Sequence, residues 1–174
     1  MKQFLVIIRG APASGKSELA KRIRDYQKKI VWLKVDNFKD FFSGKPSLDQ
    51  QKYVDECALR TLEYLLDRGF SVVMEKIFFD PHIIPQTVAA AKKRNIKVQV
   101  FQIRCPLGVL QERDRKRPGV KEGCRKPLGD KVIKKIYNQL EKTYYPGAIR
   151  LDTEKLSIEE CVEKIQDAVG SNFE

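Results

Sequence analysis

The stretch from Gly10 to Ser17 has the residue types and spacing of a phosphate-binding loop. It reads Gly10-Ala11-Pro12-Ala13-Ser14-Gly15-Lys16-Ser17, the pattern G-x-x-x-x-G-K-S, and it follows the apolar run Phe4–Ile8. Glycines here let backbone N–H groups close around phosphate oxygens, and a helix starting at this point adds the positive end of its dipole. Lys16 would contact the β- and γ-phosphates, and the Ser17 hydroxyl would bind Mg²⁺. The pattern predicts a nucleoside triphosphate site, and a glycine-rich turn without a ligand is the alternative.

A carboxylate, Asp36, follows the next strand-like run, residues 30–33. The carboxyl ends of parallel strands meet at one edge of a sheet, so Asp36 is expected to face the γ-phosphate. There it could accept the proton of a hydroxyl nucleophile. Lys39 would hold an anionic part of the acceptor. The alternatives are a turn or cap aspartate at Asp36, its role taken by Asp40, and a solvated lysine at Lys39.

A second carboxylate, Glu75, closes the strand-like run 70–74. Many P-loop proteins have an aspartate after such a strand, where it helps to hold Mg²⁺. Glu75 could support Mg²⁺ through water or bind an acceptor hydroxyl. A surface ion pair with Lys76 is the alternative.

Arginines supply the positive charge that phosphoryl transfer needs around the migrating group. Arg113 and Arg117 are four residues apart and would share a helix face, and Arg104 and Arg125 are further candidates. Residues 114–127 are basic, are interrupted by glycine and proline, and lack an apolar stripe. This composition predicts a mobile lid over the phosphates. Surface charge is the alternative for any single arginine.

The elements that must position these residues alternate along the chain. The patterns predict strands near 3–9, 30–33, 70–74, 98–103 and 148–151. They predict helices near 16–28, from a Ser47 cap to Gly69, at 82–94, after Pro106, at 128–142 and at 157–168. This alternation favours an α/β fold with a parallel sheet covered by helices. No linker or repeat divides residues 1–174, so we expect a single domain.

Composition narrows the possible partners and compartments. The chain has 174 residues, 42% of them hydrophobic, and no apolar run long enough to span a bilayer. The start Met1-Lys2-Gln3 resembles no signal peptide, and the four cysteines form no C-x-x-C pair, so we expect a cytoplasmic protein without a zinc or redox motif. The net charge is +11, and acids are concentrated in residues 151–174. The basic remainder favours anionic ligands, either a phosphorylated small molecule or a nucleic acid, and a solvated lysine-rich surface is the alternative.

Taken together, these residues resemble the small P-loop kinases of the zeta-toxin, chloramphenicol-phosphotransferase and polynucleotide-kinase type. The resemblance spans nearly the whole chain, and only the P-loop is highly specific. The matching stretches are Gly10–Ser17, residues 35–39, Glu75, Cys105-Pro106 with Leu110, Arg113 and Arg117, and Leu151-Asp152-Thr153 followed by residues 157–160.

The resemblance implies a P-loop NTPase three-layer sandwich, with a five-stranded parallel sheet in the order 2-3-1-4-5 and a short basic lid. It implies ATP and Mg²⁺ as cofactors. Asp36 would be the general base and Glu75 would contact the acceptor. The lid would contain Arg113, Arg117 and Arg125. The loop after strand five, which contains Asp152 and Thr153, would lie near the adenine.

Two departures bear on the acceptor. Lys39 stands where zeta toxins and polynucleotide kinases often have an arginine. Residues 75–80 lack the Asp-Gly-Phe-Pro-Arg-like signature of nucleoside monophosphate kinases, which counts against a nucleoside monophosphate as acceptor. The expected activity is therefore transfer of the ATP γ-phosphate to a hydroxyl of a small molecule. A kinase acting on nucleic-acid ends or charged tRNA, and an ATP-driven switch or nucleic-acid-binding protein without an acceptor, are the alternatives.

Overall fold

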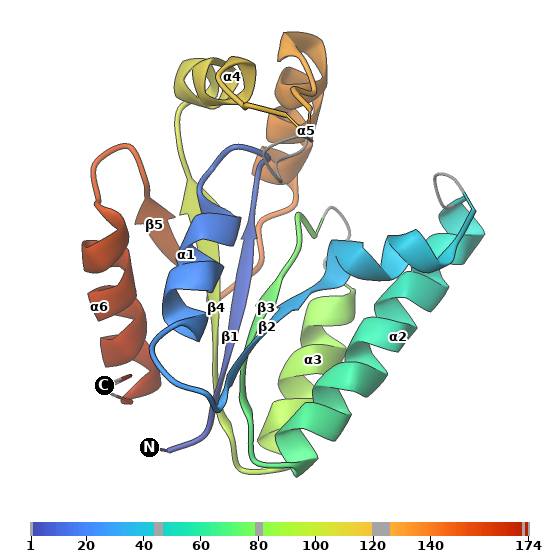
Figure 1. Ribbon diagram of the computed structural model, residues 1–174, viewed down its shortest axis with the longest axis vertical. Helices are drawn as coiled ribbons and strands as arrows, with labels where there is room; N and C mark the ends of the chain where they lie inside the picture. The colour runs from blue at the N-terminus through green and yellow to red at the C-terminus, as the bar shows by residue number, and fades with distance from the viewer. Residues whose placement is uncertain (1, 44–46, 79–81, 120–125, 172, 174) are drawn as a thin grey trace.

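A central parallel sheet organises the computed structural model, which describes residues 2–43, 47–78, 82–119, 126–171 and 173. Its strands lie in the order β2-β3-β1-β4-β5, which confirms the order expected from the resemblance (Figure 1). They are β1 (Phe4–Gly10), β2 (Ile30–Lys34), β3 (Ser71–Glu75), β4 (Lys97–Arg104) and β5 (Ile149–Asp152).

Helices cover both faces of the sheet, as predicted. They are α1 (Lys16–Arg24), α2 (Leu48–Asp67), α3 (Ile83–Lys92), α4 (Leu107–Arg115), α5 (Asp130–Lys142) and α6 (Ile158–Val169). Helices α1 and α6 pack on one face, α2 and α3 on the other, and α4 with α5 stands beyond the carboxyl edge (Figure 1). None of the helices in the described ranges is long and apolar enough to cross a membrane.

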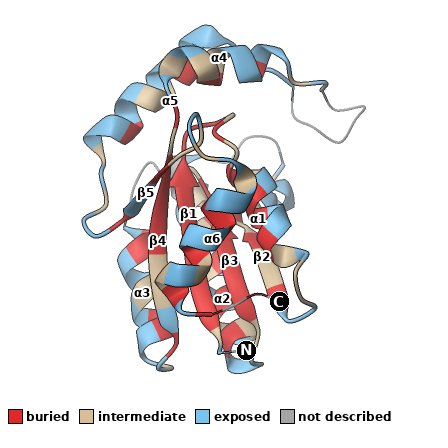
Figure 2. Cartoon of the chain, turned by 90° about the vertical axis from the view of Figure 1, so that its left-hand side faces the viewer, coloured by how far each residue is buried: buried red, intermediate tan, exposed pale blue. Residues whose placement is uncertain are grey.

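The central strand β1 separates two apolar cores. Val6 and Ile8 face the core under α1 and α6, whereas Leu5 and Ile7 face the core under α2 and α3. A strand buried on both faces reads as a continuous apolar run, which is why the run before Gly10 was recognisable in the sequence. Figure 2 shows the buried strands between helices whose outer surfaces are exposed.

The sequence predicted neither a helix nor a strand for the segment after β2. Residues 35–41 form a 3-10 helix, η1 (Val35–Phe41), rather than an irregular loop. Val35 is fully buried, and Phe38 packs against the core under α2. Contacts with α2 therefore determine this short helix, which has no periodic signal of its own. The Ser47 cap of α2 is confirmed, because Ser47 Oγ accepts from Gln50 N at 3.2 Å and Gln50 Oε1 accepts from Ser47 N at 2.9 Å.

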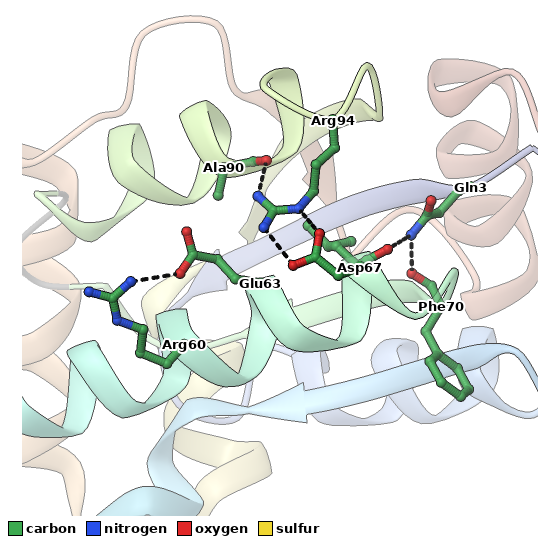
Figure 3. A network of polar contacts seen from close by, with 8 residues as sticks. Gln3, Arg60, Glu63, Asp67, Phe70, Ala90 and Arg94 are labelled. Carbon is green, nitrogen blue, oxygen red and sulfur yellow. Dashed lines mark hydrogen bonds and ion pairs between the residues drawn. The ribbon is translucent and has the colours of Figure 1, made fainter.

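Side-chain bonds also fix the end of the sheet that lies away from Gly10. Arg94, in the turn after α3, donates to both carboxylate oxygens of Asp67, at 2.6 and 2.9 Å, and so joins this turn to the end of α2 (Figure 3). Gln3 Nε2 donates to the carbonyl oxygens of Leu66 and Phe70, both at 2.8 Å. These bonds hold together the end of α2, the turn after α3 and the residue before β1, at the edge of the sheet opposite the phosphate-binding loop.

At the other end, buried polar side chains hold α4 and α5 in place. Asp114, fully buried, accepts from the backbone N of Leu128 at 2.8 Å and of Gly129 at 3.0 Å. Arg9, also fully buried, donates to Phe78 O and Thr143 Oγ1, both at 3.1 Å, and burial lowers the pKa of its guanidinium. These contacts join α4 to the start of α5 and join the end of α5 to β1, directly beside the phosphate-binding loop.

The predicted lid begins within α4, which ends at Arg115. Beyond that helix, the structure describes residues 116–119 and 126–127 of the lid. The mobility of the lid stays a prediction. Arg125 lies outside the described residues, so its proposed role stays a prediction as well.

Candidate active site

The loop between β1 and α1 has the backbone geometry of a phosphate cradle. Gly15 is the N-cap of α1 and has φ 88°, in the left-handed region that glycine adopts without strain. At Gly10, an added Cβ would lie 2.8 Å from Ile103 O, too close for any other residue. Both glycines of the G-x-x-x-x-G-K-S pattern are therefore required by the backbone. The N–H groups at the start of α1 remain available for an anion.

Lys16 lies buried beneath this loop. Its Nζ donates to Ala11 O at 2.7 Å. Burial lowers the pKa of Lys16 to about 8, while the nearby carboxylates of Glu75 and Asp36 oppose the shift. The P-loop ammonium and both candidate carboxylates thus interact within one site.

Glu75 lies under Ser17 instead of forming a surface ion pair. Ser17 Oγ is 3.1 Å from each carboxylate oxygen of Glu75, and Trp32 Nε1 donates to Glu75 Oε2 at 3.2 Å. Lys76, the alternative partner considered from the sequence, pairs with Asp55 on α2. The structure therefore joins the closing acid of β3 to the hydroxyl that was predicted to bind Mg²⁺.

Oxygen donors of this kind suit Mg²⁺. Mg²⁺ prefers hard oxygen ligands, takes few of them from the protein and keeps water and phosphate oxygens for the rest. Ser17 and Glu75 fit that requirement. Within the described ranges, no group of three or more His, Cys, Asp or Glu residues could form a closed metal centre.

Asp36 lines the same pocket as Lys16, at the start of η1. Its Oδ1 lies 2.5 Å from Nζ of Lys39, one turn further along. The structure thus brings Asp36 to the phosphate site. Lys39 contacts Asp36 and is not itself among the residues that line the pocket.

Arg113 on α4 and Arg117, two residues beyond the end of α4, have different surroundings. Arg117 lines the pocket, and its Nε lies 3.3 Å from Asp114 Oδ1. Arg113 points to the loop after β5, where it donates to Thr153 O at 2.8 Å. Arg104 pairs with Glu141 on α5. Of the arginines predicted for the transferring phosphate, Arg117 is the one that reaches this pocket in the described part of the chain.

The loop after β5 contacts the back of the phosphate-binding loop. Thr153 Oγ1 lies 3.0 Å from Ser14 O and 3.2 Å from Arg104 O. Asp152 Oδ1 accepts from the backbone N of Glu154 at 3.0 Å. Thr153 therefore supports the loop and positions Arg113, and its predicted place near the adenine stays a prediction.

The pocket is about 620 Å³ in volume and extends beyond the predicted residues. Its further lining includes side chains from α1 and β2 for which the sequence pattern predicted no role. They are Lys21, Arg24, Trp32 and Lys34. The available signal was positional: Lys21 and Arg24 lie four and seven residues after Ser17, on the same helix face.

The lowered pKa of Lys16 predicts a pH-dependent affinity for ATP. A bound triphosphate favours the charged ammonium, so ATP binding above about pH 8 must take up a proton. The affinity should stay level at lower pH and fall as the pH rises through about 8, by up to about tenfold per unit. Calorimetric titration with a non-hydrolysable ATP analogue in buffers of different ionisation enthalpy measures both the Kd and the proton uptake.

The control for this titration is Lys16→Arg, whose guanidinium stays charged across the range. This variant should bind the analogue with a flatter pH profile. A wild-type Kd that is constant from about pH 7 to 10 would contradict the prediction.

Comparisons with known proteins agree with this geometry. A family model described as "AAA domain" matches residues 5–143, and a search of curated proteins found no match. The tunicamycin resistance protein of Deinococcus radiodurans superposes with a TM-score of 0.70 at 19% identity, covering 98% of each chain. The APS kinase of Mycobacterium tuberculosis, in complex with AMPPNP and APS, has a TM-score of 0.69 at 18% identity, covering 98% of this chain and 99% of that chain.

A sugar kinase from Janibacter sp. HTCC2649 superposes with a TM-score of 0.67 at 19% identity, covering 97% of this chain and 95% of that chain. At identities this low, the superpositions establish a shared fold alone. The fold is that of the small P-loop kinases, as the resemblance in the sequence implied.

Proposed function

The chain belongs to the AAA domain family, and from this membership and its site we propose that it transfers the γ-phosphate of ATP to a hydroxyl of a small-molecule acceptor. The observation that carries the proposal is the placement of Asp36 in the same pocket as the P-loop residues Lys16 and Ser17. A nucleotide switch needs no carboxylate at this position, whereas a hydroxyl nucleophile needs an acceptor for its proton.

In the proposed reaction the acceptor oxygen forms a bond to the γ-phosphorus. The bond from that phosphorus to the β–γ bridging oxygen breaks, and ADP leaves. The hydroxyl proton passes to the carboxylate of Asp36. Lys16 and Arg117 stabilise the negative charge on the transferring group and on the departing ADP.

Two oxygen donors would hold the metal in this reaction. Ser17 and Glu75, 3.1 Å apart, would hold Mg²⁺, which supplies positive charge to the β- and γ-phosphate oxygens when bound. Trp32 donates to Glu75 and so fixes the direction of its carboxylate. Lys39 does the same for Asp36 through their ion pair. Each reacting or ligating carboxylate is thus oriented by a neighbouring donor.

The test is a transfer assay with ATP labelled in its γ-phosphate and a panel of hydroxyl compounds. We expect label to appear on a member of the panel, at a rate that far exceeds its release to water. The Lys16→Met variant, which keeps the buried side-chain volume but loses the charge, excludes a contaminating kinase. Release of inorganic phosphate alone, at a rate that no panel member changes, would contradict the proposal and favour a nucleotide-driven switch.

A further inference from the structure

Beyond the phosphate-binding residues, the pocket continues between helix α1 and the edge strand β2. Lys21 and Arg24 lie on the face of α1 that carries Ser17. Trp32 and Lys34 are two residues apart on β2 and therefore share one face of the strand. All of them line the pocket. We call Lys21, Arg24, Trp32 and Lys34 the α1–β2 groove.

Positive charge is concentrated around the indole of this groove. The guanidinium carbon of Arg24 lies 5.8 Å from the centroid of the Trp32 ring, and Nζ of Lys34 lies 5.4 Å from it. Arg24 also binds the exposed carboxylate of Asp25, at 2.7 and 2.8 Å, and Glu18 lines the pocket nearer the start of α1. The pocket lining as a whole is net positive, because its cations outnumber its acids: they are Lys16, Lys21, Arg24, Lys34 and Arg117 against Glu18, Asp36 and Glu75.

The groove lies on the acceptor side of the site. Lys34 precedes Asp36 by two residues, and it pairs in register with Glu75 on β3. Arg24 is seven residues along α1 from Ser17, which corresponds to about 10 Å at the rise of an α-helix. A ligand that placed its hydroxyl at Asp36 could therefore extend along α1 and place a second group among the cations.

We propose that the α1–β2 groove binds a phosphate group of the acceptor, so that the acceptor is itself a phosphorylated hydroxyl compound. This inference rests on the proposed function, because it assigns the groove to the acceptor. Lys21, Arg24 and Lys34 contact the acceptor's own phosphate, which takes no part in bond making or breaking. Phosphate suits this cluster because it carries more acceptor oxygens than a carboxylate for the three cations to share, and the planar fork of an arginine binds two of them at once.

Two kinds of acceptor would present both a free hydroxyl and a phosphate group to this site. A sugar phosphate carries one phosphate near a free hydroxyl, and the 5′-hydroxyl end of a nucleic acid strand carries phosphodiesters beyond it. Lys39 pairs with Asp36 and does not line the pocket, so the groove takes the role in binding the acceptor's anionic group that the sequence pattern assigned to Lys39.

The chain's single tryptophan makes the inference directly measurable, because Trp32 fluorescence reports on the groove. The protein is first saturated with Mg²⁺ and a non-hydrolysable ATP analogue, so that the P-loop is filled. It is then titrated with ribose 5-phosphate, with a short 5′-hydroxyl oligonucleotide, and with ribose as the uncharged control. We expect a saturable change in emission with a phosphate-bearing probe and none with ribose.

Substitutions locate the binding. Arg24→Ala and Lys21→Ala should each raise the Kd of the phosphate probe by about tenfold or more, as expected for loss of a charged hydrogen bond. The matched control is Arg22→Ala, on another face of α1, where Arg22 lies 3.7 Å from Glu159. It should leave the Kd unchanged. If thermal unfolding shows Arg24→Ala to be misfolded, Lys21→Ala carries the comparison.

Two results would overturn the inference: no saturable response to either phosphate-bearing probe, or equal Kd values for the Lys21 and Arg22 variants. Tighter and steeply salt-dependent binding of the oligonucleotide would identify a nucleic-acid end as the source, and comparable binding of ribose 5-phosphate would identify a small molecule.

The measurement is made without turnover, so the two proposals can fail separately. If the probes bind in the groove but no hydroxyl ever receives the γ-phosphate, the proposed function fails. If hydroxyl compounds are phosphorylated with KM values that Lys21→Ala leaves unchanged, the groove inference fails.

Discussion

Replacing Arg117 with alanine should lower kcat for phosphate transfer by about 10³-fold or more, the range typical of an arginine that stabilises the transferring phosphate. Arg117 lines the phosphate pocket, and its Nε lies against the buried carboxylate of Asp114. Held in this way, its guanidinium is already oriented when charge develops on the γ-phosphate. Single-turnover transfer with saturating ATP measures the effect on the chemical step.

Arg113 and Lys116 provide the comparisons. Arg113 donates to Thr153 O rather than lining the pocket, so Arg113→Ala should raise the KM for ATP and change kcat far less. Lys116 is exposed and pairs with Glu112 at 2.6 Å, so Lys116→Ala should behave like the wild type. Equal losses of kcat in the Arg113 and Arg117 variants would show that both reach the transition state and would contradict the division seen in the structure.

Replacing Asp36 with asparagine should lower kcat by about 10²- to 10⁴-fold, the usual contribution of a general base. Asparagine has nearly the same shape but cannot take the hydroxyl proton. The affinity for a non-hydrolysable ATP analogue should change little, because the phosphate contacts come from the loop before α1 and from Lys16. Rapid-quench transfer and calorimetric binding together separate the two effects.

The matched control is Asp40→Asn, in the same 3-10 helix. Asp40 is exposed and does not line the pocket, so this variant should retain wild-type transfer. The sequence left Asp36 and Asp40 as competing candidates. Loss of transfer in the Asp40 variant, with activity retained in the Asp36 variant, would reverse the assignment and remove the main support for the proposed function.

The order and type of the elements followed from local signals. The continuous apolar run of β1 reflects burial on both faces, and the Ser47 capping box marked the start of α2 within one residue. The 3-10 helix η1 was missed because Val35 and Phe38 are held by contacts with α2, which lies on the far side of an unpatterned segment. Local patterns record what one element buries, and they do not record which distant element buries it.

The candidate site divides in the same way. By itself, the sequence determined the phosphate-binding loop, because Gly10, Gly15, Lys16 and Ser17 act through backbone geometry and spacing within a single turn. It also placed Asp36 and Glu75 at strand ends, since parallel strands bring their carboxyl ends to one edge.

Only the tertiary structure decided how these groups act together. It joined Glu75 to Ser17, directed Arg117 into the pocket and Arg113 out of it, and opened the groove between α1 and β2. Each of these depends on the packing of side chains from elements far apart in the chain. Charge and helical spacing define a face, whereas the neighbour that the face meets is determined by the assembled sheet.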